Sequence, residues 1–280
     1  MATVTWNDSA ADGDLSNVAN YSTGALPNNG DTFIIAQGVT PIQLGLTALA
    51  AITLAVFQVT EGYKGQYIGS DTAAMSISTI TSFLFKASPN LVYAKFTAPV
   101  TKATVDGTGA GQFIVAGNTW ALLQACSQGV IQIATDSTVT ALTTGGNVRA
   151  FARPKGSGAG FTTLEIGAGS LLETERDVVN GGTALCDGTL VFKSTATLAG
   201  TSVLTLTSRG VALLKSLGVT YNKIKAFAGS KVDPTGMTRD SILSTLIRHR
   251  GANVIRKSGG VGLTITTEEV LGGDDPLFLK

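Results

Sequence analysis

The sequence has a single histidine and only two cysteines, which limits the catalytic and metal-binding sites that it can build. His249 lies between Arg248 and Arg250, and two flanking cations disfavour its protonated form. We expect it to be a polar surface residue rather than a general base, and one histidine cannot supply a His-rich metal site. Cys126 and Cys186 stand alone in β-like surroundings without a Cys-x-x-Cys motif, so we expect two buried free thiols.

Charge is also scarce. Charged residues make up 14% of the chain, and 20 basic side chains nearly balance 19 acidic ones. The formal net charge of +1 provides no overall field that would attract nucleic acid or an anionic membrane. The chain is poor in the Glu, Lys and Arg that cover helices, yet at 44% hydrophobic residues it is too apolar to be disordered. We therefore expect a folded, helix-poor protein that binds neither nucleic acid nor membrane.

A secretory leader and a membrane helix are not expected either. Met1–Asn7 has neither the basic region nor the apolar region of a leader. Val39–Val59 carries no charge and approaches the length of a membrane span, but it contains Pro41, and its second half, Ile52–Val59, is β-like. We expect two buried strands joined by an Ala-rich corner here, in a protein that is made and assembled inside a cell.

Glycine is abundant, with 34 residues, and it falls between short β-prone runs. Within Phe161–Gly210, the runs Thr163–Ile166, Thr189–Lys193 and Ser202–Thr207 alternate apolar with small or polar residues, which is the period of a half-buried strand. Corners with glycine, such as Asn180–Gly182, separate these runs. Coiling such a chain lets each strand pair with the strand one coil before it, so its backbone groups are satisfied. The sequence therefore predicts an all-β protein, a parallel β-helix.

The same rhythm extends from Phe33 to about Ile265. Further strands are expected at Phe33–Ala36, Thr53–Val59, Met75–Ile80, Phe83–Lys86, Leu91–Phe96, Gln112–Val115, Val130–Ala134, Val148–Phe151 and Gly262–Thr266.

Three regions are expected along the chain: residues 1–38 as an N-terminal cap, residues 39–266 as the β-helix, and residues 267–280 as a C-terminal extension. Trp6 and Tyr21 would cover the first coil, whose end otherwise exposes an apolar core and unpaired backbone groups. The alternative is that the two rings form a platform for sugar stacking, but no acidic cluster accompanies them.

Two segments after Val211 have a different pattern. Leu213–Leu217 and Arg239–Arg250 each have the composition of a short amphipathic helix. In the second segment, Ser241–Arg248 also alternates as a strand does, and corner-like sequences flank it on both sides. We favour the strand in this segment.

The acids of the middle of the chain show no catalytic arrangement. Enzymes that cleave polysaccharides on β-helix scaffolds need paired carboxylates on neighbouring coils. Here only Glu173, Glu175 and Asp177 cluster, in the pattern of a solvated face, and the glycine-rich Asp106–Gly111 lacks the spacing of a dinucleotide fingerprint. We expect a protein that is not an enzyme, with no cofactor and no metal. The mid-chain acids are thinly spread, at Asp106, Asp136, Glu165, Glu173, Glu175, Asp177 and Asp187.

A spaced set of residues near the N-terminus resembles the start of known β-helix proteins. Trp6 is followed by Asn20-Tyr21, Pro27 and Gly30-Asp31-Thr32, and then by Gly-, Thr- and Val-rich runs. This start resembles that of right-handed β-helix proteins of two kinds, secreted adhesins and structural proteins of tailed-bacteriophage virions, among them decoration or cement proteins and fibres.

The resemblance implies a right-handed β-helix that forms a homotrimer and binds the capsid protein or other virion subunits. The missing leader favours a virion protein over an adhesin, so we expect a cement or decoration protein on the capsid surface, made in the host cytoplasm. The alternative is a tail fibre or tailspike that recognises surface polysaccharide, with or without glycan-cleaving activity.

The last residues suggest a contact with a partner. Leu277, Phe278 and Leu279 are three large apolar residues that follow Pro276 near the chain end. Chain ends are usually polar unless they are held by a contact. We expect these three residues to dock on a neighbouring subunit or on the shell. The alternative is that they fold back over the last coil as a cap.

Overall fold

The structure is a computed structural model, and it describes residues 1–70, 72–86, 92–107, 112–117, 119–153, 160–176, 178–193, 204–214, 220–235, 240–258 and 261–272. These residues form an all-β parallel β-solenoid, as the strand-and-corner rhythm predicts. The one helix among them is a single 3-10 turn, η1 (Val18–Asn20). The right hand of the coil and the N-terminal cap stay predictions.

The chain divides into two units, which are described in turn. The first contains Met1–Leu142 and Gly146–Phe151, and the second contains Thr143–Gly145 and Ala152–Lys280. Two strands lie where the chain passes between the units, β11 (Thr138–Thr144) and β12 (Asn147–Ala152).

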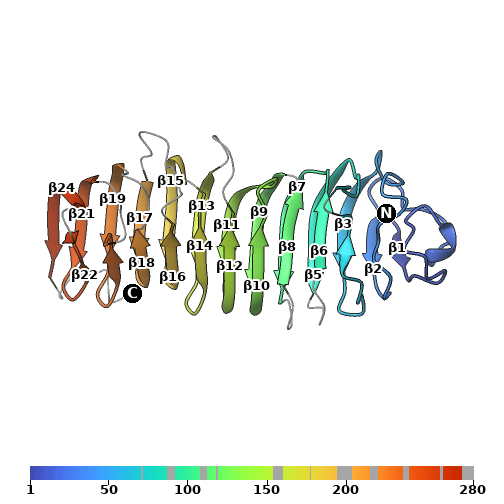
Figure 1. The fold of residues 1–280 in the computed structure, drawn as a ribbon, viewed down its shortest axis with the longest axis horizontal. Helices are drawn as coiled ribbons and strands as arrows, with labels where there is room; N and C mark the ends of the chain where they lie inside the picture. Colours follow the sequence, from blue (N-terminus) through green and yellow to red (C-terminus); the bar gives the residue numbers. More distant parts are fainter. Residues whose placement is uncertain are drawn as a thin grey trace. The chain divides into compact units, whose positions relative to one another are not determined.

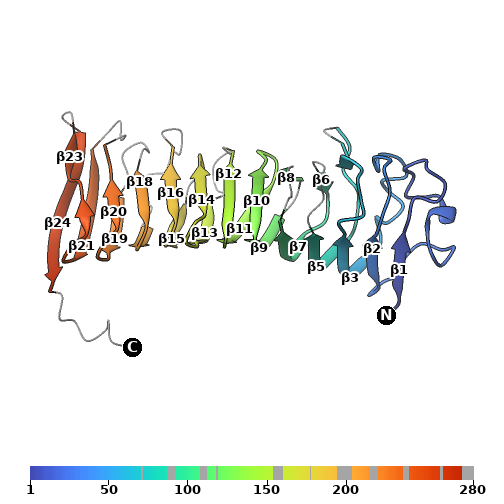
Figure 2. The same ribbon diagram turned by 90° about the horizontal axis from the view of Figure 1, so that it is seen from below.

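In the first unit, consecutive coils contribute strands to two parallel sheets (Figures 1 and 2). One sheet has the order β1 (Thr3–Trp6), β2 (Thr32–Ile35), β3 (Thr53–Val59), β5 (Thr79–Lys86), β7 (Val100–Asp106) and β9 (Thr119–Cys126). The other has the order β4 (Tyr67–Ile68), β6 (Val92–Phe96), β8 (Gln112–Gly117) and β10 (Gln128–Ile133).

The second unit repeats this arrangement. One sheet has the order β13 (Phe161–Ile166), β15 (Val178–Cys186), β17 (Leu204–Ser208), β19 (Thr220–Ala226), β21 (Ser241–His249), β24 (Val261–Leu271) and β23 (Lys257–Ser258). The other has the order β14 (Leu171–Thr174), β16 (Thr189–Phe192), β18 (Val211–Leu214), β20 (Lys231–Asp233) and β22 (Asn253–Val254). Of the strand-to-strand pairings described, only that of β23 with β24 is antiparallel, and the isolated bridge of Trp6 with Tyr21 is antiparallel as well.

The register places the same kind of residue at the same point of each coil. In the first unit the pairing aligns one buried column, with each member 20 to 29 residues after the last: Val4, Phe33, Phe57, Phe83, Ala103 and Leu123. In the second unit the corresponding column advances by 18 to 22 residues through Leu164, Ala184, Leu206, Ile224 and Leu246. Because side chains alternate along a strand, the flanking residues face outward.

Several expected strands are found where the alternation predicts them. Thr53–Val59 is β3, Thr163–Ile166 lies in β13, and the disputed Ser241–Arg248 lies in the strand β21. The helix considered at Leu213–Leu217 is wrong for its first two residues, which end β18, while residues 215–219 lie outside the described residues.

Other expectations are wrong. The first half of Val39–Val59 is not a strand, because turns and isolated bridges such as that of Ile42 with Ile68 occupy it before β3 begins. Asn180–Gly182, expected as a corner, lies inside β15. None of the described residues belongs to a helix with the length and apolar character needed to cross a bilayer.

Candidate functional site

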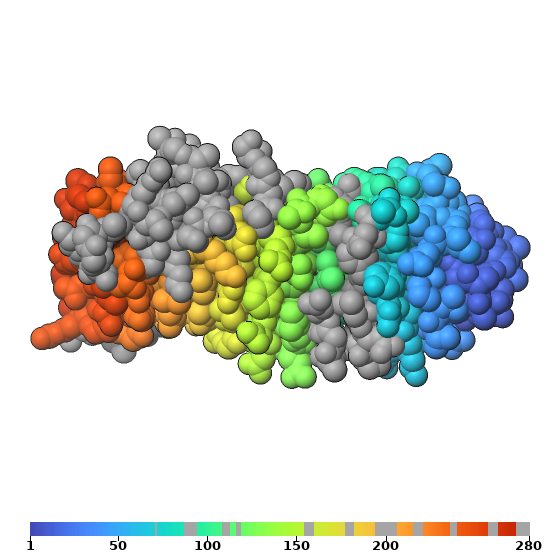
Figure 3. All heavy atoms as spheres, in the orientation of Figure 1, coloured from blue at the N-terminus to red at the C-terminus, as the bar shows by residue number. Residues whose placement is uncertain are grey.

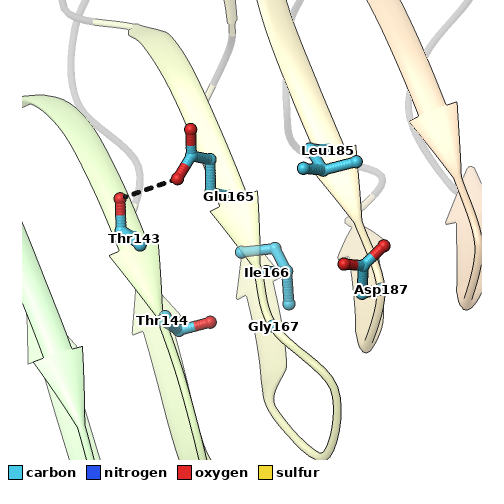
Figure 4. Close-up of a pocket in the computed structure, with 7 residues that line it drawn as sticks. All are labelled: Thr143, Thr144, Glu165, Ile166, Gly167, Leu185 and Asp187. Carbon is cyan, nitrogen blue, oxygen red and sulfur yellow. Dashed lines mark hydrogen bonds between the residues drawn. The ribbon is translucent and has the colours of Figure 1, made fainter. Parts of the chain in front are cut away.

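A hollow of about 200 Å³ lies in the second unit, where the strands of the larger sheet reach a corner (Figure 4). Its walls come from three successive coils, those of β11, β13 and β15. The lining residues are Thr143, Thr144, Glu165, Ile166, Gly167, Leu185 and Asp187.

Strand pairing brings these residues together. Glu165 pairs with Leu185 in the register of β13 and β15, and both face outward from the core. Thr143 Oγ1 donates a hydrogen bond to Glu165 Oε2 at 3.4 Å. Asp187 follows β15 directly, and its amide donates to the carbonyl of Ile166 at 2.8 Å. The two acids of the hollow therefore come from neighbouring coils.

The carboxylates of the hollow do not converge. Figure 4 shows Glu165 turned toward Thr143, whereas Asp187 lies on the other side of Ile166. The guanidinium of Arg209 is 3.7 Å from Asp187 Oδ1, which places a cation beside this acid. The hollow therefore offers hydrogen-bond acceptors on one side and the ion pair of Asp187 with Arg209 on the other. This arrangement suits the binding of a ligand with several hydroxyl groups better than it suits catalysis, in which two carboxylates must act on the same bond.

Sequence reasoning missed this pairing of acids. Glu165 and Asp187 were expected to be isolated, yet Asp187 lies only two residues beyond Leu185, the partner of Glu165 on the next coil. A search for acids within two residues of one coil length would have found them.

An aromatic and basic cluster continues along the same corner. The ring of Phe227 stacks on the imidazole of His249, with centroids 4.5 Å apart and planes at 10°. Arg209 Cζ lies 5.2 Å and Lys225 Nζ 4.9 Å from the centroid of the same ring, both within cation–π distance. The expectation of a surface histidine is wrong: His249 is 3% exposed, because its flat ring packs on Phe227.

The cysteines are both free thiols, as expected, but only one is fully buried. Cys186 is 0% exposed, and burial raises the pKa of its thiol to about 12. Cys126 is half-buried, so its expected burial is only partly met. No group of three or more His, Cys, Asp or Glu side chains suited to a metal ion occurs among the described residues.

Trp6 and Tyr21 are buried in the first coils. Trp6 is 0% and Tyr21 4% exposed, and Tyr21 donates a hydrogen bond to the Leu15 carbonyl at 2.6 Å. Trp6 meets Tyr63 edge-on at 6.3 Å, and Tyr21 lies 6.0 Å from Phe33. Neither ring leaves a face open to a sugar, which favours the cap over the sugar platform. In Figure 3 the residues nearest the N-terminus, in dark blue, lie at one end of the first unit.

Polar residues of the N-terminal cadence hold this region in place. Asn20 accepts a hydrogen bond from the Ala10 amide at 2.8 Å and donates to Asp12 Oδ1 at 2.7 Å. Asp31 accepts from the amides of Ala2, at 2.6 Å, and Asn28, at 3.0 Å. These hydrogen bonds lower the pKa of Asp31, since they favour its charged form.

Comparison with known proteins gives no match. No protein-family model, no curated protein and no solved structure matches this chain. The resemblance to β-helix proteins of virions therefore rests on the cadence from Trp6 to Thr32. Leu277, Phe278 and Leu279, expected to bind a partner, lie outside the described residues.

Proposed function

We propose that the protein is a non-enzymatic structural protein of a tailed-bacteriophage virion, which binds capsid subunits as a cement or decoration protein. It would be made in the host cytoplasm, assemble as a homotrimer and lie on the capsid surface. The supporting observation is the outward face of the larger sheet in the first unit.

Two columns of outward side chains on that face carry little charge, and the charged Lys86 and Asp106 lie beyond them at the strand ends. One column is Thr3, Thr32, Val56, Ser82, Lys102 and Leu122, and the other is Thr5, Ile34, Gln58, Leu84, Thr104 and Gln124. Lys102 is the one charged residue among them. Apolar residues at Ile34, Val56, Leu84 and Leu122 are half-buried rather than fully covered.

Such a face costs little to desolvate, because it carries few groups that must give up strong hydration. Its regular spacing also offers a firm surface for lateral packing against copies of the chain and against the shell. Binding and bracing of shell subunits needs this kind of contact, and it needs no catalytic group.

The test is to place a charge within the face. Purified wild-type protein is mixed with shells that lack it, and bound protein is measured by sedimentation. We expect Leu84→Asp to lower shell binding at least about tenfold, since a buried unpaired carboxylate is costly at an interface. Glu61→Lys, an exposed charge change at a corner, is the control. Absence of wild-type binding, or equal binding by Leu84→Asp, would contradict the proposal.

A second candidate function is recognition of a surface polysaccharide, as in a tail fibre or tailspike. The hollow with Glu165, Asp187 and the neighbouring Arg209 favours it, because carboxylates and a cation suit hydroxyl and acidic groups of a glycan. It is tested by titrating purified host-surface polysaccharide into wild type, Glu165→Gln and Asp187→Asn. Binding that both substitutions weaken supports this function. Absence of binding by the wild type contradicts it, and release of shorter glycans would show cleavage.

A further inference from the structure

At the two ends of the larger sheet, β1 and β24 differ in how their outer edges are covered. On β1, the edge opposite β2 is covered by residues 20–22. Trp6 and Tyr21 form an antiparallel bridge, and the Ser22 amide donates to the Thr5 carbonyl at 2.8 Å. The Asn7 amide donates to the Asn20 carbonyl at 2.9 Å. No further strand can add at this edge without displacing these residues.

Among the described residues, only the start of the outer edge of β24 is covered. On one side β24 pairs with β21 from Ser241–Leu263 to His249–Leu271. On the other side β23 pairs with Val261 and Gly262, and the Leu263 amide donates to the Arg256 carbonyl at 2.8 Å. Within the described residues, nothing pairs with the outer edge of Thr264–Leu271. An uncovered edge strand is a template for another strand.

We propose that this edge pairs antiparallel with the β24 edge of a second copy, around a two-fold axis. A two-fold contact uses the same strand twice, so it needs no other free edge. Stacking of β24 onto β1 of another copy would need the edge that residues 20–22 already cover. The symmetric pairing of two β24 edges is thus the contact between copies that displaces neither residues 20–22 at β1 nor β23 at β24.

The burial pattern selects one register for this pair. Ile265 and Glu268 continue the columns of Leu243 and Leu246, which are 0% exposed and face the core. Cores of the two copies join only when these two positions oppose each other. The register that achieves this has Thr266 opposite Thr267, with the axis between them. It places Ile265 opposite Glu268 and Thr264 opposite Glu269, and it stops short of Leu263, whose amide already donates to the Arg256 carbonyl.

Charges are compatible with this register. Glu269 is exposed, and it lies opposite Thr264 of the second copy rather than opposite another acid. Glu268 is already neutralised on its own chain, by Arg248 at 3.3 Å and by an ion pair with Arg256. No like charges oppose each other, which β pairing requires.

The register is tested by charge placement at Thr264, an exposed position. Thr264→Glu puts a carboxylate opposite Glu269 at two places in the dimer, whereas Thr264→Lys puts an ammonium there. We expect sedimentation velocity of the full chain to show that Thr264→Glu raises the dissociation constant of end-to-end association about tenfold or more. Thr264→Lys keeps or lowers that constant. The double variant Thr264→Glu with Glu269→Lys restores association.

Thr183→Glu, an exposed outward position within the sheet of the second unit, is the matched control and should have no effect. Side-by-side association of the chains does not interfere with this test. Loss of the β24 contact halves the mass of the particle, whatever number of chains associate side by side. The proposal is overturned if wild type shows no such association, or if Thr264→Glu and Thr264→Lys behave alike. It is also overturned if only a chain without residues 273–280 associates, since the chain itself then covers the edge.

Discussion

Single aromatic side chains carry much of the packing in the first unit. Six of the eleven phenylalanines are among its fully buried residues: Phe33, Phe57, Phe83, Phe85, Phe96 and Phe113. Phe83 lies at the centre, with its ring 5.3 to 5.9 Å from those of Phe57, Phe96, Phe113 and Trp120. Low aromatic content therefore does not mean a weak core, because the few rings are gathered in one place.

Phe83→Ala should reduce the free energy of unfolding by about 3–5 kcal/mol, because it leaves a cavity among rings that cannot close it. The measurement is urea denaturation followed by tryptophan fluorescence, which reports on Trp120 beside the cavity. Leu84→Ala is the control, as the next residue faces outward and should cost less than about 1 kcal/mol. Equal losses for both variants would contradict the assignment of the core face.

Asp233 is expected to make stability depend on acid pH. Its side chain is 11% exposed, with Oδ2 2.8 Å from Lys231 Nζ. Burial raises the pKa of Asp233, but hydrogen bonds from Lys231 and Thr235 outweigh it and lower the pKa to about 2. Because an unfolded aspartate has a pKa of about 3.9, the native state holds the charged form more strongly. This stabilisation is complete above that value and is lost as the pH falls toward 2.

Asp233→Asn should therefore lower the free energy of unfolding at neutral pH by roughly 1–2 kcal/mol. The difference from wild type should shrink as the pH is lowered from 4 toward 2. Denaturation curves at a series of pH values measure it, and Lys231→Gln should lose part of the same pH dependence. A difference that stays constant with pH would show that the charge of Asp233 is not responsible.

Residue identity alone predicted some of these features and not others. The burial of Trp6 and Tyr21 follows from the sequence, because large aromatic rings favour the core over the surface. The burial of His249 does not follow, because its neighbours in the sequence are two arginines and its packing partner, Phe227, belongs to the preceding coil. A contact set by coil length stays hidden until the register is known.

Corners are the elements that set how closely two coils approach. At Gly210 an added Cβ would lie 2.0 Å from the Gly188 carbonyl oxygen and 2.6 Å from that of Asp187. Both neighbours are backbone atoms of the previous coil, so they cannot move aside as a flexible side chain would. Glycine at this corner is therefore required by the spacing of the coils.

Gly210→Ala should destabilise the second unit by about 1–3 kcal/mol, because the coils must separate to admit the methyl group. Gly145→Ala is the matched control: it is also a corner glycine, but its Cβ would meet nothing within 4 Å. This control should change stability by less than about 1 kcal/mol, in either direction. Thermal unfolding followed by circular dichroism compares the two, and a similar shift in both would contradict the close approach at Gly210.

Strands were easier to predict than the corners between them. Alternation located β3 and β13, since one face of each meets the core. Glycine misled at Asn180–Gly182, which continues inside β15, and apolar content misled at residues 39–46, which form isolated bridges but no strand. The conformational preferences of glycine and valine are local, whereas the point at which a strand ends depends on its pairing with the neighbouring coil.

For the whole molecule, the proposed attachment to a shell predicts a separable role for the last residues. Deleting Leu277–Lys280 should leave the thermal unfolding of the isolated protein unchanged but lower its incorporation into particles at least about tenfold, because three apolar anchors are lost. Quantitative mass spectrometry of purified particles measures incorporation. Replacing only Lys280 with alanine is the control. Lost stability would favour the cap role, and unchanged incorporation would end the anchor hypothesis.

Stacked coils also set the order in which the protein can form. Strands that pair belong to neighbouring coils, so each new coil needs only the one before it as a template. The covered edge at β1 makes the N-terminal coil the first that can be complete. We expect coils to form in the order in which the ribosome releases them, so that nascent chains whose released part ends at Leu123 already protect β1 to β7 from protease.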